Sequence, residues 1–97
     1  MSAQRCQHEL TDEQFQAIGR AIADPRRFAI LKQIAESENL TCSALQAHDV
    51  ITPATISHHL RELTEAGLVQ MVRCGRVSNL SFCRPVWEAY RERLAEL

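Results

Sequence analysis

The chain has 97 residues, of which 45% are hydrophobic and 24% are charged, and its formal net charge is −1 with a sequence pI of about 6.4. This length suits one domain, and the composition is that of a folded globular protein rather than a disordered chain. No apolar run approaches membrane-spanning length, and residues 1–8 lack the apolar segment of a secretory signal, so we expect a cytoplasmic protein without a membrane partner. The near-neutral charge counts mildly against nucleic-acid binding, because phosphate contacts supply most of the affinity of that class.

A first helix is predicted to begin after a flexible tail of residues 1–9. Thr11 followed three positions later by Gln14 is a capping-box pattern, in which each side chain bonds the backbone N–H of the other residue. Apolar residues then recur at helical spacing, which predicts a helix with the apolar stripe Phe15, Ile18 and Ile22.

Two further helices are expected in the first half of the chain. Asp24 is a favoured N-cap and Pro25 fits the first helical position, which predicts the start of a second helix. Its inward-facing residues are expected to be Phe28, Leu31, Ile34 and Ala35. A short third helix is expected to begin at Thr41 or Ser43 and to end near His48.

A fourth helix is predicted to begin at Thr52-Pro53, which repeats the pattern of an N-cap followed by proline, and to run to Ala66. Gly67 supplies a left-handed residue after the helix. Leu68 is then expected to pack back on Leu63 in a Schellman-type end.

After this helix the pattern changes to that of strands. Residues 69–73 and 77–82 are rich in Val, Leu and Phe, and Gly75 lies between them, where a tight turn favours it. We therefore expect a β-hairpin, followed by a last helix over residues 85–97. The predicted fold class is mainly α with a β-hairpin wing, in the order helix, helix, helix, helix, hairpin, helix, with residues 10–97 forming one domain.

The third and fourth predicted helices form a helix-turn-helix, whose second helix normally lies in the major groove of DNA. At about 100° per residue, Ile56, Leu60 and Leu63 share one stripe of the fourth helix, which must face the core. The opposite side is polar and begins with small residues, which allow close approach to base edges and phosphates. The residues expected to contact DNA from this helix are Thr52, Ala54, Thr55, Ser57, His58 and Arg61.

Arg73 and Arg76 lie on either side of the predicted hairpin tip, where a projecting wing would contact the phosphate backbone or the minor groove. Polar helix faces and charged turns are also common on solvated surfaces, so a purely structural role stays open for both. The adjacent His58 and His59 do not predict a metal site, because neighbouring residues on a helix point about 100° apart. His59 lies beside the apolar stripe and is expected to be a packing residue.

Three segments resemble the ArsR/SmtB family of bacterial winged-helix repressors. Residues 23–31 (ADPRRFAIL) are similar to its second-helix signature, residues 52–63 (TPATISHHLREL) to its recognition helix, and residues 65–69 with 73–76 to the end of that helix and the wing. The resemblance extends from about Leu10 to the C-terminus. It implies a winged helix-turn-helix homodimer that blocks a promoter and releases it when an inducer binds. The expected partner is a pseudo-palindromic duplex, since a symmetric dimer reads two half-sites.

The metal sites of the family are not present in their usual form. Where its metal sensors have Cys-x-Cys at the start of the third helix, this chain has Thr41 and Ser43 around a single Cys42, and its last helix has neither His nor Asp. A soft metal or metalloid inducer stays open as a hypothesis, with a thiol sensor formed across the dimer by Cys6, His8 and Cys42. The alternative is that these cysteines are small apolar fillers or idle surface thiols.

A dimer is also indicated by the last helix, which has an apolar stripe at i, i+3, i+7 and i+10. The residues of the stripe are Trp87, Tyr90, Leu94 and Leu97. On a chain this short the stripe would be largely exposed unless a second subunit covered it. Phe15, Ile18 and Ile22 of the first helix are expected to complete the dimer interface.

We therefore expect a sequence-specific DNA-binding transcriptional regulator, a repressor released by an inducer. The alternative is a winged-helix module for protein interaction or dimerisation without DNA binding, which the near-neutral charge keeps open. An enzyme is not expected, because the sequence has no nucleophile motif, no Gly-rich phosphate loop and no paired carboxylates in a plausible pocket.

Overall fold

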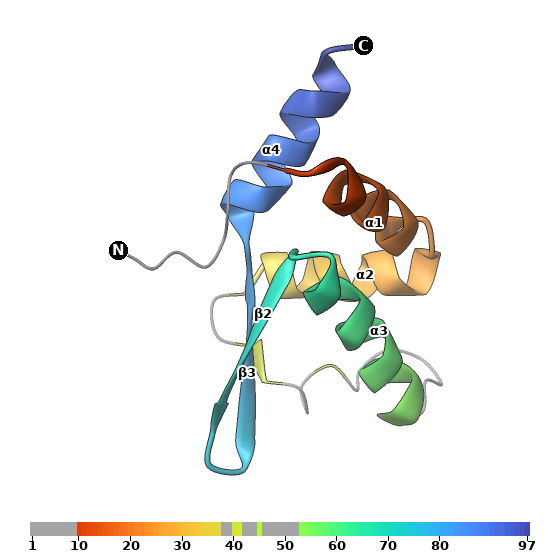
Figure 1. Ribbon diagram of the computed structural model, residues 1–97. Helices are drawn as coiled ribbons and strands as arrows, with labels where there is room; N and C mark the ends of the chain where they lie inside the picture. Colours follow the sequence, from red (N-terminus) through yellow and green to blue (C-terminus); the bar gives the residue numbers. More distant parts are fainter. Residues whose placement is uncertain (1–9, 38–39, 42–44, 46–52) are drawn as a thin grey trace.

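The computed structural model describes residues 10–37, 40–41, 45 and 53–97. The helices in this part of the chain are α1 (Asp12–Ile22), α2 (Pro25–Ala35), α3 (Pro53–Glu65) and α4 (Arg84–Ala95), and the strands are β1 (Leu40–Thr41), β2 (Val69–Cys74) and β3 (Val77–Phe82) (Figure 1). The predicted class, mainly α with a β-hairpin wing, is confirmed. The predicted tail, most of the short third helix and the Thr52 cap lie outside the described residues.

The predicted N-caps of α1 and α2 are confirmed, but only half of the capping box forms. Thr11 Oγ1 accepts a hydrogen bond from the Gln14 N–H at 3.0 Å, and Asp24 Oδ1 accepts from two backbone N–H groups of α2 at 2.9 and 3.2 Å. The Gln14 side chain, expected to reach back to Thr11, instead donates from Nε2 to the carbonyl oxygen of Ala66 at 3.1 Å. This bond ties the first turn of α1 to the end of α3.

The end of α3 has the predicted Schellman geometry. Gly67 has a φ of 83°, the Leu68 N–H bonds the Leu63 carbonyl at 3.1 Å, and the Gly67 N–H bonds the Thr64 carbonyl at 3.0 Å. Both leucines are fully buried. The helix therefore ends abruptly and the chain turns directly into β2.

The sheet has one strand more than the sequence predicted. β2 and β3 form the expected antiparallel hairpin around Gly75, whose φ is 65°. β1 lies along the other edge of β3 and pairs Leu40 with Leu80 and Thr41 with Asn79. The prediction that the short third helix begins at Thr41 or Ser43 is not tested, because residues 42–44 lie outside the described residues.

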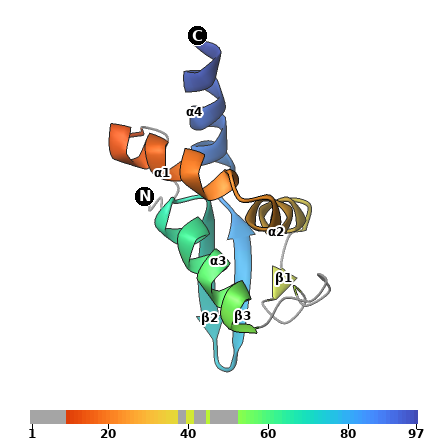
Figure 2. The ribbon, with the colours of Figure 1, turned by 90° about the vertical axis from the view of Figure 1, so that its right-hand side faces the viewer.

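The core lies where α1, α2 and α3 pack together against the base of the sheet (Figures 1 and 2). Its largest fully buried side chains are Ile18, Ile30, Ile34, Leu45, Leu63, Leu68, Leu80 and Val86. The prediction that Phe28 faces inward is wrong, since its side chain is 41% exposed. The buried side of α2 is centred on Ile30 and Ile34, and at about 100° per residue Phe28 lies well off that centre.

Different elements lie at the two ends of the molecule. The N-terminal end of α3 and the tip of the hairpin lie at the same end in both views, and α4 rises away from them at the other end (Figures 1 and 2). α4 begins one residue before and ends two residues before the predicted range of 85–97. No helix in the described ranges is long and apolar enough to cross a membrane.

Candidate nucleic-acid interface

α3 has a buried side and an exposed side, as its periodicity predicts. Ile56, Leu60 and Leu63 are at most 8% exposed. The residues exposed on the other side are Ala54, Ser57, His58, Arg61 and, in the last turn, Glu65. Thr55 is half-buried, and Thr52 lies outside the described residues. The exposed side therefore begins with two small side chains and continues with an imidazole and a guanidinium group.

The buried His59 is held by a polar contact that joins three helices. Its side chain is 5% exposed, and its Nδ1 accepts a hydrogen bond from Arg27 Nε at 3.2 Å. Arg27 Nη1 also donates to the Ala21 carbonyl at 3.3 Å, near the end of α1. Burial lowers the pKa of His59 and the Arg27 charge lowers it further, while the Asp24 carboxylate opposes both effects. A neutral His59 ring is thus the form that fits this position, and the expectation of a packing residue is confirmed.

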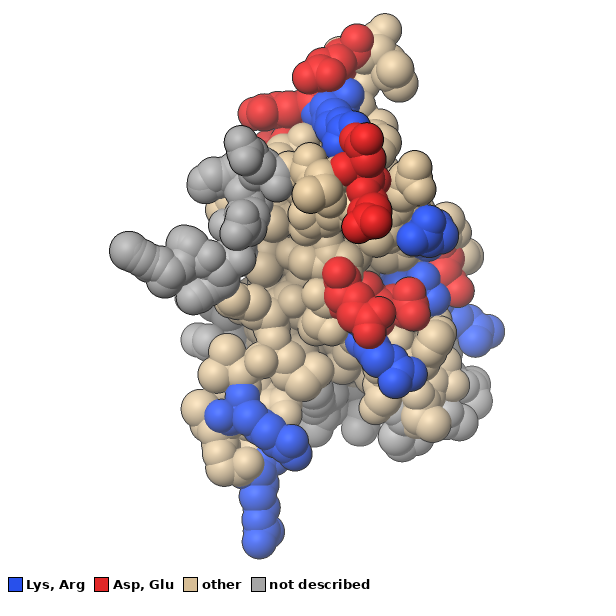
Figure 3. Space-filling view, in the orientation of Figure 1, with Lys and Arg blue, Asp and Glu red and all other residues tan. Residues whose placement is uncertain are grey.

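The hairpin carries only positive charge. Residues 69–82 contain Arg73 and Arg76 and no Asp or Glu, and both arginines are exposed. Figure 3 shows basic side chains at the hairpin end of the molecule, with the acidic side chains of this face lying away from it. Within the described residues, the ion pairs involve arginines of α4 and leave Arg61, Arg73 and Arg76 uncompensated. The uncompensated arginines of the hairpin lie at the same end of the molecule as the first turns of α3.

The seven predicted dimer residues lie on α1 and α4 and divide into two groups. Phe15 and Tyr90 bring these helices together, with 5.1 Å between their ring centroids. Ile18 is fully buried and Tyr90 is 6% exposed, so both belong to the core of the chain itself. The residues that keep exposed surface are Phe15, Ile22, Trp87, Leu94 and Leu97. Leu94, on the half of α4 that projects from the molecule, is 41% exposed, and Leu97, two residues beyond the end of α4, is fully exposed.

The proposed thiol sensor of Cys6, His8 and Cys42 lies outside the described residues. In the part of the chain that is described, no three His, Cys, Asp or Glu side chains form a group that could hold a metal ion. Cys74 is exposed beside the hairpin turn, and Cys83 is buried at the start of α4. The described residues therefore offer no ready metal site.

Residues 22–72 match the family model of a helix-turn-helix domain. The crystal structure of an ArsR family transcriptional regulator is 26% identical, with a TM-score of 0.80 and coverage of 90% of this chain and 89% of that one. A possible transcriptional regulator for arsenical resistance is 29% identical, with a TM-score of 0.72 and coverage of 90% and 84%. The homodimeric winged helix-turn-helix DNA-binding domain of a possible ArsR-family regulator from Mycobacterium bovis is 22% identical, with a TM-score of 0.69 and coverage of 92% and 88%. The sequence has no significant match among curated proteins.

The family match spans about half of the chain and includes α2, α3 and the start of the wing. The similar solved structures extend the likeness to nine-tenths of the chain, with α1 and α4 included. The chain therefore belongs to the helix-turn-helix domain family and is an ArsR-family winged helix-turn-helix transcriptional regulator, a class of protein that is not enzymatic.

Proposed function

We propose that the chain works as a homodimeric repressor that binds a pseudo-palindromic DNA operator and leaves it when an inducer binds. The observation that carries this proposal is that the exposed side of α3 begins at the same end of the molecule as the positive tip of the hairpin. Residues 10–97 then act as one unit, with DNA contacts at this end and subunit contacts at the end formed by α1 and α4.

The exposed side of α3 suits the major groove. Ala54 and Ser57 are small, so the helix can approach the base edges closely. His58 and Arg61 then reach bases or nearby phosphates with donors that nucleic acid accepts. Arg76 at the hairpin turn would contact the phosphate backbone and carry no sequence preference of its own.

The proposed dimer rests on α4. Leu94 on α4 and Leu97 just after it leave apolar surface exposed at the end of the chain that projects from the rest of the molecule, and such surface favours association. The similar domain from Mycobacterium bovis is homodimeric. A symmetric dimer would present two copies of α3 to successive major grooves, about 34–36 Å apart along the duplex.

The test is a fluorescence-polarisation titration against an operator selected from a pool of random duplexes, repeated over a series of salt concentrations. His58→Ala should weaken operator binding by roughly 1–3 kcal/mol and leave binding to unrelated duplexes nearly unchanged, if His58 reads a base edge. Arg76→Ala should weaken binding to all duplexes alike and lower the salt slope by about one. The matched control is Arg91→Ala, because Arg91 is an exposed arginine on α4 and should not affect DNA binding.

Two results would contradict the proposal. Wild-type affinity in both His58→Ala and Arg76→Ala would mean that the DNA interface lies elsewhere on the chain. Failure to select any duplex, even at low salt, would favour the alternative of a winged-helix protein-interaction module, for which the formal net charge of −1 is no obstacle.

A further inference from the structure

An apolar groove opens between α2, the end of β3 and the start of α4, on residues that the proposed DNA and dimer contacts mostly do not use. Its volume is about 170 Å³. The residues that line it are Phe28, Leu31, Lys32, Ala35, Phe82 and Trp87. We infer that this groove binds a small aromatic carboxylate, with the ring between the aromatic side chains and the carboxylate at Lys32.

The size of the groove selects its occupant. A cavity of about 150 Å³ lined by apolar side chains accommodates one benzene molecule, so a volume of about 170 Å³ fits a single ring with a short substituent. A whole helix from another chain, roughly 10–12 Å across with its side chains, is too wide to lie inside a groove of this size, so only a small ligand or a single inserted side chain fits.

The walls of the groove are preformed. Trp87 stacks on Tyr90 with 5.7 Å between ring centroids and lies 6.4 Å from the Phe82 ring. Leu31 is 3% exposed and belongs to the core. Phe28 also lines the groove and is 41% exposed, so an inserted ring would cover an aromatic surface that the chain itself leaves in contact with water.

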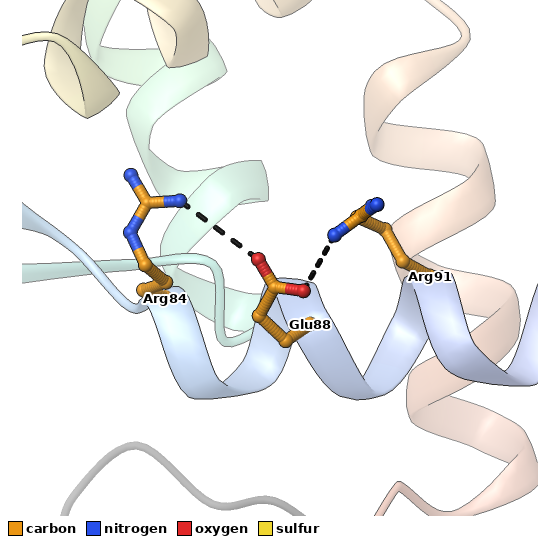
Figure 4. Close-up of polar contacts among 3 residues, drawn as sticks. All are labelled: Arg84, Glu88 and Arg91. Atoms are coloured by element: carbon orange, nitrogen blue, oxygen red, sulfur yellow. Dashed lines mark hydrogen bonds and ion pairs between the residues drawn. The ribbon is translucent and has the colours of Figure 1, made fainter.

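The charge around the groove favours an anion. Lys32 is exposed and is the only charged residue that lines it. The Arg84 guanidinium carbon lies 5.0 Å from the centre of the Phe82 ring, which brings a second positive group to the neighbourhood. Figure 4 shows Glu88 between Arg84 and Arg91, at 3.9 and 2.5 Å, so this cluster keeps one net positive charge. A carboxylate is therefore attracted to this side of the molecule, and a cationic ligand is repelled.

The groove is also placed to influence DNA binding, a consequence that rests on the proposed function. α2 carries Phe28 and Leu31 into the groove, and the same helix holds α3 through the bond from Arg27 to His59. β3, which ends at Phe82, is a strand of the wing. A ligand in the groove would thus contact the helix that positions α3 and a strand of the wing.

The test uses the intrinsic fluorescence of Trp87, the only tryptophan of the chain, so that emission reports directly on the groove. The full-length wild-type chain is titrated with phenylacetate and, separately, with the neutral phenylacetamide. Phenylacetate should give a saturable change in emission. Lys32→Gln should weaken phenylacetate about five- to tenfold and leave phenylacetamide unchanged. Phe28→Ala should weaken both probes, and Val72→Ala, which removes an exposed apolar side chain of the wing, should affect neither.

The folded state of each variant is checked by circular dichroism, and both substitutions in the groove are at exposed positions. An emission that neither probe changes would overturn the proposal, and so would equal affinities of wild type and Lys32→Gln for phenylacetate. Sedimentation that finds a wild-type dimer and a monomeric Phe28→Ala would also overturn it, since a second copy of the chain would then fill the groove. The titration contains no DNA, so its failure is distinct from a failure of the repressor proposal.

Discussion

The contact between Arg27 and His59 predicts how the stability of the fold depends on pH. The His59 ring is 5% exposed and accepts a hydrogen bond at Nδ1, so a proton at this atom would remove the bond and place a second positive charge beside Arg27. The groups that face the ring are Arg26, Arg27, Asp24 and the neighbouring His58, and of these only Asp24 favours the charged form. Burial and these charges together lower the pKa of His59 from its ordinary value of 6.5.

The sign and size of the effect follow from the proton balance. Above pH 6.5 the His59 ring is neutral in both states and its contribution to stability is complete. As the pH falls through 6.5 the unfolded chain takes up a proton that the folded chain resists, so the free energy of unfolding decreases until the folded-state pKa of His59 is passed. One proton changes this free energy by at most about 1.4 kcal/mol per pH unit.

The assay is urea denaturation of wild type and variants at several pH values from about 5 to 7.5. His59→Gln keeps a neutral polar side chain that does not titrate, so its free energy of unfolding should depend less on pH than that of wild type. Val72→Ala changes an exposed side chain of the wing and should keep the wild-type slope. Asp24 does not interfere, because the N–H groups of Arg27 and Arg26 lower the pKa of its carboxyl below 3.8 and its contribution is lost only in stronger acid. Equal slopes in wild type and His59→Gln would refute the reasoning.

Two further predictions concern the proposed interface and the end of α3. Replacing Leu94 and Leu97 together by glutamate should convert dimers to monomers in sedimentation with no loss of helix content, since both side chains are exposed; an unchanged mass would contradict an interface on α4. Gly67→Ala should lower the free energy of unfolding by about 2 kcal/mol and Gly75→Ala by about 1 kcal/mol, as measured by urea denaturation. Both glycines have positive φ, but only at Gly67 would a Cβ collide with the Gln14 amide and displace its bond to the α3 end; equal losses would contradict this account.

The features that the sequence predicts correctly depend on residues close together in the chain. Asp24 caps α2 through N–H groups two and three residues away, and Gly67 ends α3 by a left-handed turn at its own position. The strand β1 could not be predicted in this way, because Leu40–Thr41 is too short to show a period and exists by pairing with β3. The Gln14 side chain likewise bonds a carbonyl 52 residues away in the chain. The local capping pattern therefore predicted the N-cap of α1 but not the bond that the Gln14 side chain makes.

For the candidate site, too, the sequence predicted features that depend on nearby residues and missed those that depend on distant ones. The exposed side of α3 follows from its helical period, because Ile56, Leu60 and Leu63 fix the side that faces inward. The hydrogen-bond partner of His59 could not be predicted from the sequence, because Arg27 lies 32 residues away in the chain and the residues around it indicate only the start of a helix. The groove beside Phe28 could not be predicted for a different reason. α2 has apolar residues on more than one side, so its sequence does not decide whether Phe28 faces inward or outward. Packing of α2 against α3 and β3 decides this.

α2 is the element that connects the His59 contact with the proposed ligand groove. It packs against α1, α3 and β3, so a change at any of these reaches the others through it. Its first turn contributes Arg27, which holds α3 by way of His59, and its residues from Phe28 to Ala35 line one side of the groove. Protonation of His59 and ligand binding in the groove would therefore both act on contacts of this one helix. α3 carries the proposed DNA-reading residues, and β3 belongs to the wing. A small tilt of α2 would change the position of α3 relative to the wing. Because both must contact the same duplex at once, such a change would weaken DNA binding.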